Sequence, residues 1–474
     1  MTATATPAPM HARPTDPDAN AIGNFLRQQR YWSPDAPQPY LHNDLHVMID
    51  GREAMLSMYR EMLQARHSID IATWFLNADF EVVRGADRAD LPPASDGTYQ
   101  IASLLADRAR DGVAARVLLW KGSLIGTMNS FRVNRTRKAL VRHPGIQCAA
   151  DGTEGFSHCH HQKVLLIDGH TAFVGGLDFT DQDADRWDTP EHRTRNNPKK
   201  RCWHDVHCRF TGPAASAVAL NMAQRWREVT GESISFPIPE SHTIPGMPIQ
   251  VLRTLPKGVH DFAPDGDFGV DGALLTAILH AERYIYIENQ YLWSSKITAA
   301  LIHQMRRHPS RNFRIVVLLP DEPNIGRSDS DQMVRRLMKV GRKTGMIRVC
   351  TLGKPASAKK GTPPIYVHSK TMIVDDGWFC VGSANLNGRG LVSDTEMNIS
   401  SVHEATARDL RLRLWCEHLQ MPKEDLALLD VTETIDRFWP RDEGQPVGRV
   451  LPYNLGSWIR DLQIGVPEAV LLDL

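Results

Sequence analysis

A pattern of polar residues occurs twice in this chain of 474 residues, and the repetition constrains the fold more than any other feature of the sequence. Both copies have the form His-x-Lys-x4-Asp, and they occupy His161, Lys163 and Asp168 and then His368, Lys370 and Asp375. Each copy leads into a glycine-containing turn, a second apolar run and a pair of small residues, Gly175-Gly176 or Gly382-Ser383. The match extends over about 200 residues in each half, so the chain is expected to form two similar units.

Predicted helices and strands alternate in both halves, which is typical of α/β proteins. Short apolar runs rich in β-branched residues predict strands at 68–75, 115–120, 145–150, 164–167, 171–174, 203–210, 284–290, 314–319, 347–350 and 366–375. Apolar residues at helical spacing predict helices at 50–66, 101–109, 214–228, 272–282, 297–307 and 333–342. The expected fold class is therefore α/β, with two similar α-β-α lobes related by a pseudo-two-fold axis and followed by a C-terminal extension.

Changes in composition predict the boundaries of these units. Residues 1–44 are expected to be disordered or extended, 45–230 to form the first lobe, 231–248 to be a proline-rich linker, 249–420 to form the second lobe and 421–474 to be the extension. The extension is expected to pack across the lobes.

Charge and cysteine content narrow the class of protein. Lys plus Arg equals Asp plus Glu at 55 each, so no overall positive field attracts the chain to nucleic acid. The seven cysteines are irregularly spaced, which favours reduced thiols and synthesis in the cytoplasm. The N-terminal stretch lacks the basic and apolar regions of a cleaved signal, and no apolar run approaches the roughly 20 residues of a membrane span. We therefore expect no transmembrane segment and no signal peptide, and any export would use a signal-independent route.

A pseudo-two-fold axis would bring the two polar patterns face to face in one pocket. Side chains alternate along a strand, so the histidine and the lysine of each copy are expected to point the same way. The pocket would hold His161, Lys163, His368 and Lys370, with Asp178, Ser383 and Asn385 contacting a phosphate. The lysines would neutralise the non-bridging oxygens of a phosphodiester, mainly in the transition state. One neutral histidine would attack phosphorus, and the other, protonated, would donate to the leaving oxygen.

Each of these histidines requires an acceptor that fixes its tautomer. Asp205 and Glu396 occupy equivalent positions in the two halves, and Asp205 is expected to be the carboxylate that serves His161. Asp168 and Asp375 end their strands at tight turns. They are therefore expected to support the local fold through hydrogen bonds.

The two patterns resemble the HKD motifs of the phospholipase D superfamily. The resemblance covers residues 45–420 and includes flanking segments similar to phosphatidylcholine-type enzymes, namely Arg186-Trp187-Asp188, Trp203-His204-Asp205, Glu288-Asn289-Gln290 and Gly382-Ser383-Ala384-Asn385. It implies the phospholipase D fold, a catalytic role for all six motif residues, and a covalent phosphohistidine formed without a metal or other cofactor. In that reaction His161 would be the nucleophile and His368 the acid and then the base. The implied products are phosphatidic acid and a headgroup alcohol, and an alcohol in place of water would give transphosphatidylation.

Other functions could use the same residues. A nuclease of the superfamily would need a broad basic groove with interleaved aromatic residues, which the balanced charge disfavours. A phospholipid synthase would transfer the phosphatidyl group from the same intermediate. A binding module without activity is disfavoured because both motifs are complete. The run Cys202-x-His204-x2-His207-Cys208 contains zinc-ligand types, but its spacing fits no standard zinc motif, so no metal is expected.

The expected partner is a phospholipid at a membrane surface, which the enzyme would approach peripherally, and no nucleic acid is expected. The basic loop 193–201 would be solvated surface or would attract anionic headgroups. By analogy with this family, a bacterial enzyme of this type could be an exported antibacterial effector, which would add a secretion or immunity protein as partner. The headgroup, the preference between hydrolysis and transfer, and the oligomeric state are left open by the residues.

Overall fold

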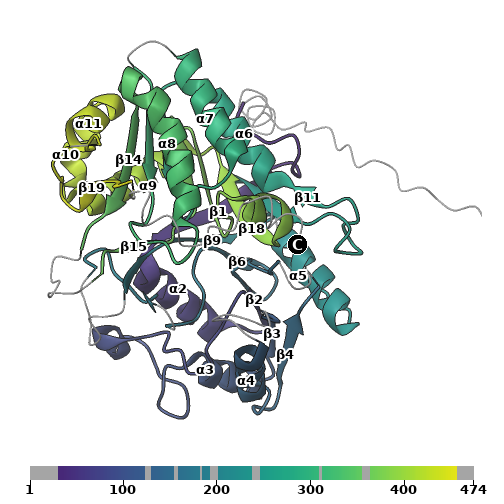
Figure 1. Ribbon diagram of the computed structural model, residues 1–474. Helices are drawn as coiled ribbons and strands as arrows, with labels where there is room; N and C mark the ends of the chain where they lie inside the picture. Colours follow the sequence, from purple (N-terminus) through teal and green to yellow (C-terminus); the bar gives the residue numbers. More distant parts are fainter. Residues whose placement is uncertain are drawn as a thin grey trace, which may run out of the picture.

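The computed structural model shows two halves, each built from a sheet and the helices that cover it (Figure 1). It describes residues 30–122, 130–153, 158–181, 184–192, 201–237, 246–308, 312–354, 363–442 and 444–455. The lead-in before residue 30, most of the basic loop and the middle of the expected linker lie outside these residues. Within the described ranges, no helix is long and apolar enough to cross a membrane.

The sheet of the first half has the strand order β1-β9-β6-β5-β2-β3-β4. Its strands are β1 (Tyr40–Ile49), β2 (Ser68–Thr73), β3 (Ala114–Trp120), β4 (Ile146–Asp151), β5 (Val164–Ile167), β6 (Thr171–Gly175) and β9 (Val206–Thr211). Helices connect β2, β3 and β4, which therefore run parallel. The strands β5 and β6 form the hairpin expected from the turn at Asp168-Gly169.

The sheet of the second half repeats this order as β10-β18-β17-β16-β12-β13-β14, with β19 added at its edge. Its strands are β10 (Met247–Leu255), β11 (Asp267–Phe268), β12 (Tyr284–Glu288), β13 (Arg314–Leu318), β14 (Ile347–Leu352), β16 (Thr371–Val374), β17 (Trp378–Gly382), β18 (Glu396–Ser401) and β19 (Val450–Pro452). Each strand of the first sheet thus has a counterpart at the same distance from the centre. The expectation of two similar α/β lobes is confirmed.

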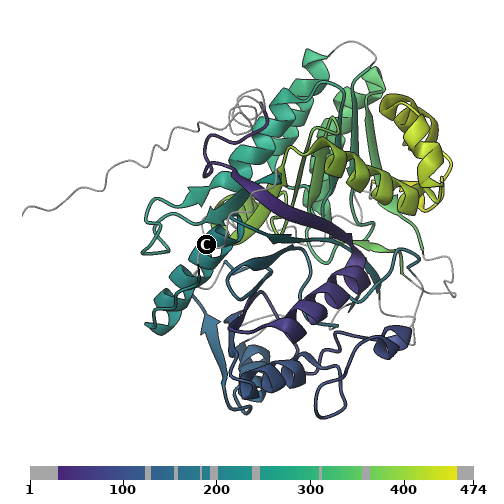
Figure 2. The same cartoon turned by 180° about the vertical axis from the view of Figure 1, so that it is seen from behind.

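The two sheets join where β1 and β10 pair antiparallel, with Asn43 opposite Met247. Two equivalent strands that run antiparallel side by side are exchanged by a two-fold rotation, so the pseudo-two-fold axis passes between them. Figure 2 shows β1 crossing the molecule between its halves. The start of β1 lies in the segment expected to be an extended lead-in, and β10 begins inside the expected linker.

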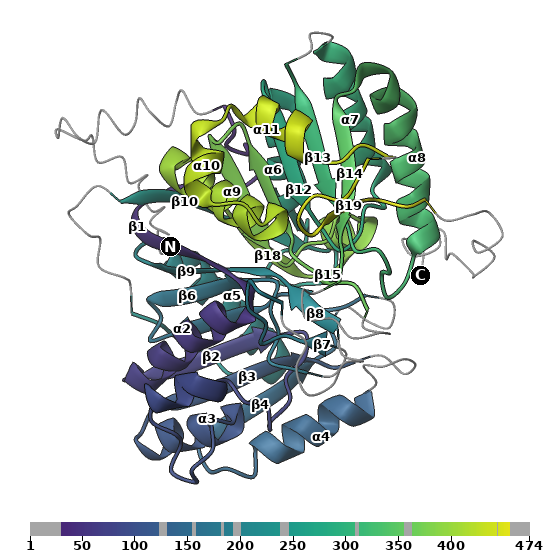
Figure 3. The same cartoon turned by 90° about the vertical axis from the view of Figure 1, so that its left-hand side faces the viewer.

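Helices cover the outer faces of both sheets and part of the space between them (Figure 3). They are α2 (Asp50–Gln64), α3 (Ile101–Arg110), α4 (Ser130–Leu140), α5 (Ala215–Thr230), α6 (Gly269–His280), α7 (Ser295–Arg307), α8 (Arg327–Thr344), α9 (Glu404–Leu419), α10 (Lys423–Leu428) and α11 (Val431–Phe438). One apolar cluster packs α2 and α3 on the first sheet, and a second packs α6, α7 and α8 on the other. A third, shared by both halves, lies between the sheets and includes Trp226 of α5 and Trp415 of α9.

A small sheet with the order β15-β8-β7 connects the halves at one end of the molecule. It contains β7 (Ala184–Asp185), β8 (Arg201–His204) and β15 (Tyr366–Val367). The single strand expected at 203–210 is in fact broken at Asp205 into β8 and β9. This break matters for the site, because β8 leaves the first sheet and pairs with the strand that precedes His368.

The described part of the C-terminal extension packs mainly on the second half. Strand β19 pairs with β14, and Trp439 packs against Tyr286 and Trp415. Contact with the first half comes from Arg449, which donates hydrogen bonds to the carbonyls of Pro190 and Glu191. The extension therefore completes the second lobe more than it bridges the two.

Candidate active site

The histidine and the lysine of each motif lie in an extended segment immediately before β5 or β16. In both copies the backbone of the histidine is fixed by the opposite half. The amide of His161 donates to the carbonyl of Thr395, and the amide of His368 donates to the carbonyl of His204, each at 2.9 Å. Thr395 and His204 directly precede Glu396 and Asp205. The same backbone contact therefore brings each histidine beside a carboxylate of the other lobe.

The carboxylates are exchanged between the lobes. Nδ1 of His161 lies 2.9 Å from Oε1 of Glu396, and Nδ1 of His368 lies 2.7 Å from Oδ2 of Asp205. The expectation that Asp205 serves His161 is therefore wrong, although each of the two expected carboxylates lies beside a motif histidine. With Nδ1 held by a carboxylate, Nε2 is the nitrogen of each ring that is left to react.

The interruption of the strand at Asp205, between β8 and β9, allows this carboxylate to reach His368. Asp205 is fully buried and accepts hydrogen bonds from the amide of Val206 and the indole of Trp203. A side chain at Gly176 would collide with it, because a Cβ there would lie 2.0 Å from Oδ1 of Asp205. The small residue is thus required by the close approach of the carboxylate.

In the second half the residue beside the carboxylate is a serine and not a glycine. Ser383 stands where Gly176 stands in the first half, and its hydroxyl donates to Oε2 of Glu396. Ser383 is fully buried and its hydroxyl orients Glu396, and the phosphate contact expected of it stays a prediction. Asn385 is buried with no hydrogen-bond partner for Oδ1 among the described residues, and its amide group stays a candidate for phosphate contact.

The two lysines are buried and have different partners. Nζ of Lys163 donates to the carbonyl of His161 at 2.7 Å and lies 3.5 Å from Oδ2 of Asp178. Nζ of Lys370 donates to the carbonyl of His368 and to Oε1 of Gln290. This position lets Asp178 orient Lys163, and the phosphate contact expected of it stays a prediction.

Burial dominates the electrostatics of the site. Together with the ammonium groups of Lys163 and Lys370, it holds the pKa of His161 well below its usual value, and with Lys370 it does the same for His368. Burial raises the pKa of Glu396 to about 8 and that of Asp205 to about 6. Burial therefore favours the neutral form of both imidazoles. A phosphodiester would add negative charge and favour protonation of one imidazole.

Aromatic and cationic side chains that sequence reasoning did not assign complete the wall beside His368. The ring of Trp203 lies 4.4 Å from the ring of His368, and the guanidinium of Arg186 lies 4.2 Å from the ring of Trp203. On the other side, Trp74 meets the ring of His161 edge-on at 6.2 Å. The flanking motifs contained Trp203 and Arg186, whereas no pattern in the sequence indicated Trp74.

The motif aspartates lie at the far end of the strands, as expected for a supporting role. Asp168 accepts hydrogen bonds from three consecutive backbone amides, those of Arg66, His67 and Ser68, which lead into β2. Asp375 does the same for Glu282, Arg283 and Tyr284, which lead into β12. Each aspartate therefore ties the start of a neighbouring strand to the turn after the motif strand.

Replacing this acceptor should affect stability far more than chemistry. We expect Asp168→Ala to lower the free energy of unfolding by roughly 2–4 kcal/mol, because it leaves amide groups of Arg66, His67 and Ser68 without a partner. The matched variant Asp168→Asn keeps one acceptor oxygen and should lose less. Urea unfolding measures both. A loss of activity in a well-folded Asp168→Asn variant comparable to that of a His161 variant would contradict the supporting role.

The Cys/His run of the first half does not gather as a metal site. Among the described residues, the groups of side chains placed to share an ion contain no cysteine. His207 lies against the glycine turn, where its Nδ1 accepts the amide of Leu177. His204 turns the other way, into a buried cluster with carboxylates.

The fold and the site together define a duplicated α/β phosphodiesterase. A family model described as "Phospholipase D" matches residues 61–248, and one described as "Cardiolipin synthase, PLD-like domain" matches residues 274–415. The chain belongs to the phospholipase D superfamily and is a phospholipase D-type phosphodiesterase.

Curated relatives from plants and an amoeba agree with this assignment. Phospholipase D alpha 3 of Arabidopsis thaliana is 24% identical over an alignment that covers 93% of this chain and 75% of the relative. Phospholipase D A of Dictyostelium discoideum is 25% identical, covering 80% of this chain and 36% of the relative. The crystal structure of phosphatidylserine synthase from Haemophilus influenzae superimposes with a TM-score of 0.53 at 12% identity, covering 88% and 94% of the two chains, and supports the fold.

Proposed function

We propose that the enzyme hydrolyses glycerophospholipids such as phosphatidylcholine to phosphatidic acid and the headgroup alcohol. The observation that carries this proposal is the exchanged pair of hydrogen bonds, from His161 to Glu396 and from His368 to Asp205, with a buried lysine beside each histidine. Two equivalent imidazoles with free Nε2 atoms suit a displacement at phosphorus that needs a nucleophile on one side and an acid on the other. The names of the plant relatives support a phospholipid substrate.

In the proposed first step, Nε2 of His161 attacks phosphorus and the bond to the headgroup oxygen breaks. His368, protonated at Nε2, gives its proton to that oxygen, while Lys163 and Lys370 neutralise the non-bridging oxygens. In the second step, His368 removes a proton from water, the hydroxide oxygen bonds to phosphorus, and the bond to His161 breaks. An alcohol that replaces this water would yield a transphosphatidylation product.

One experiment separates the candidate functions. The purified chain is incubated with phosphatidylcholine vesicles, with the same vesicles plus a primary alcohol or serine, and with single-stranded DNA. Release of choline and phosphatidic acid without DNA cleavage supports the proposal. New phospholipid in preference to phosphatidic acid would favour the synthase, and DNA cleavage without choline release would overturn the lipid substrate.

The alkaline limb of the pH profile of kcat/KM should be set by Lys370. Burial lowers the pKa of Lys370 to about 7. The ammonium is therefore charged below this pH and is lost as the pH rises through it, so binding of an anionic diester weakens on the alkaline side. We expect kcat/KM to fall above pH 7 in the wild type. Because a guanidinium stays charged, the Lys370→Arg variant should lose the fall that begins near pH 7, though at lower activity.

The control for this profile is the exposed Lys138, near the end of α4. A Lys138→Arg variant should reproduce the wild-type curve in the same steady-state assay over pH 5–10. An alkaline fall that persists unchanged in Lys370→Arg would show that another group controls it.

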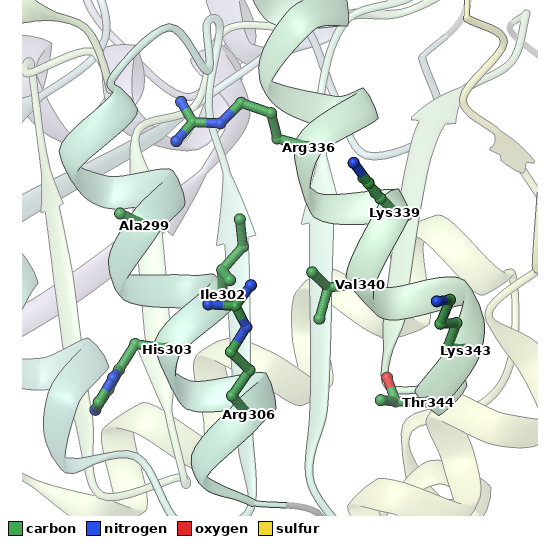
Figure 4. Close-up of a pocket in the computed structure, with 9 residues that line it drawn as sticks. All are labelled: Ala299, Ile302, His303, Arg306, Arg336, Lys339, Val340, Lys343 and Thr344. Atoms are coloured by element: carbon green, nitrogen blue, oxygen red, sulfur yellow. The ribbon is translucent and has the colours of Figure 1, made fainter.

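A groove between α7 and α8 supports contact with a membrane surface (Figure 4). It has a volume of about 790 Å³, Ile302 and Val340 lie between the helices, and its exposed basic residues are His303, Arg306, Arg336, Lys339 and Lys343. Such a surface suits anionic headgroups. We expect the double variant Lys339→Glu/Lys343→Glu to bind vesicles containing phosphatidylserine several-fold more weakly in sedimentation assays, with unchanged turnover of a soluble short-chain lipid. Equal binding would exclude this groove.

A further inference from the structure

A buried cluster of imidazoles and carboxylates lies between the lobes, directly behind the His368 pair. Its central members come from distant parts of the chain: Asp50 begins α2, His192 follows β7, His204 ends β8 and Glu417 lies near the end of α9. Asp50, His192 and His204 are fully buried and Glu417 is 8% exposed. One ligand atom from each lies within 4.8 Å of all the others.

The shortest contacts in the cluster share two atoms, Oε1 of Glu417 and Nδ1 of His204. Oε1 of Glu417 lies 3.0 Å from Nε2 of His192 and 3.1 Å from Nδ1 of His204. Oδ1 of Asp50 lies 3.0 Å from the same Nδ1. These separations are a few tenths of an ångström below the roughly 3.4 Å edges of a tetrahedron with metal–ligand bonds of about 2.1 Å. Two imidazole nitrogens and two carboxylates are a ligand set that suits zinc and related divalent ions.

The second nitrogen of each imidazole is held from outside the cluster. Nδ1 of His192 lies 2.8 Å from Oδ2 of Asp188, and Nε2 of His204 lies 3.0 Å from Oε2 of Glu288. Histidines that bind a metal through one ring nitrogen almost always give the other N–H to such a carboxylate or carbonyl, which fixes the tautomer and the ring orientation. Nε2 of His192 and Nδ1 of His204 are left facing Oε1 of Glu417, and Nδ1 of His192 also lies 3.9 Å from Oδ2 of Asp50.

An unpartnered atom provides independent evidence for a ligand. Oδ1 of Asp50 is already engaged by His204 and by the amide of Asp205, whereas Oδ2 is buried, has no hydrogen-bond partner among the described residues and lies 3.9 Å from Nδ1 of His192. A buried carboxylate oxygen without a partner is costly, and a cation would remove that cost. We propose that Asp50, His192, His204 and Glu417 form a closed, structural site for a divalent metal ion of the zinc type.

The site would not take part in the chemistry, because all four ligands are protein groups and no position is left for substrate. It would instead position the catalytic pair. Oδ1 of Asp50 also accepts the amide of Asp205, and the carbonyl of His204 accepts the amides of His368 and Ser369. The ion would thus tie α2 and α9 to the backbone that holds Asp205 against His368.

The test is the metal content of the full chain, measured by mass spectrometry after growth with added zinc and removal of loose ions. We expect one ion per chain, a rise in melting temperature of a few degrees when Zn²⁺ is returned to chelator-treated protein, and visible absorption of a four-coordinate centre when Co²⁺ replaces it. The variants His192→Asn and Glu417→Gln should lose the ion. The variant His207→Gln, from the same Cys/His run but outside the cluster, should keep it.

A chain without bound metal that shows no thermal response to Zn²⁺ or Mn²⁺ would overturn the proposal, and the cluster would then be a protonated hydrogen-bond network. Retention of the ion by both ligand variants would place it elsewhere and also overturn it. If the ligand variants do not fold, the titration of chelator-treated wild-type protein still decides. None of these measurements depends on the lipid substrate.

Discussion

His161→Ala should abolish turnover, with a loss of at least about 10⁴-fold in kcat for choline release, because the variant lacks the imidazole proposed to form the bond to phosphorus. His368→Asn should behave differently. The nucleophile is intact in this variant, so a phosphoenzyme can form slowly, but the base that activates water is missing. With a phospholipid labelled at phosphorus, we expect label on the protein in His368→Asn and none in His161→Ala.

The matched control is His170, which is exposed on the turn between β5 and β6. A His170→Ala variant should retain wild-type turnover. Label on the protein in His161→Ala but not in His368→Asn would show that His368 is the nucleophile and His161 the acid and base. Substantial activity in His161→Ala would exclude a covalent intermediate on this residue.

The second large effect concerns the exchanged carboxylates. Asp205→Asn should slow choline release by roughly 10²–10³-fold, because His368 loses the group that stabilises its protonated form and its tautomer. A phosphatidyl ester of p-nitrophenol needs no acid for departure of the leaving group. With this substrate, Asp205→Asn should give a burst of about one nitrophenol per active site, followed by slow hydrolysis of the phosphoenzyme.

Glu396→Gln should give no such burst, because the carboxylate of Glu396 fixes the tautomer of His161, the proposed nucleophile. Stopped-flow absorbance distinguishes the two variants directly. If each carboxylate served the histidine of its own lobe, the results would be interchanged: the burst would appear in Glu396→Gln and be absent in Asp205→Asn. Wild-type enzyme provides the reference for the size of the burst.

Local signals in the sequence were enough for most of the fold. The hairpin after Lys163 and its counterpart after Lys370 follow from apolar runs and turn residues, and the repeat led to two equivalent lobes. No strand was predicted at the position of β1. One reason is that its first half, around His42 and Asn43, is polar. Its burial depends on β10, a strand some 200 residues away that cannot be paired with it by periodicity.

The sequence pointed to the two carboxylates beside the motif histidines, but not to the histidine that each one contacts. Equivalence in the repeat identified Asp205 and Glu396, but it cannot tell which lobe each faces, because a two-fold axis permits both pairings. The break of the strand at Asp205 was not predicted, because Val206, Cys208 and Phe210 alternate with polar residues as in one continuous strand. Asp178 and Ser383 contact Lys163 and Glu396, and those contacts depend on side-chain directions that spacing alone does not fix.

The exchange of carboxylates also has a consequence for how such a chain can change over generations. A substitution at Glu396 acts on the histidine encoded in the other half, and a substitution at Asp205 does the same in return. The two halves therefore cannot accumulate mutations independently, even though each has its own core. If the two halves are expressed as separate polypeptides, each should be inactive alone. Activity should return only when the halves associate through pairing of β1 with β10.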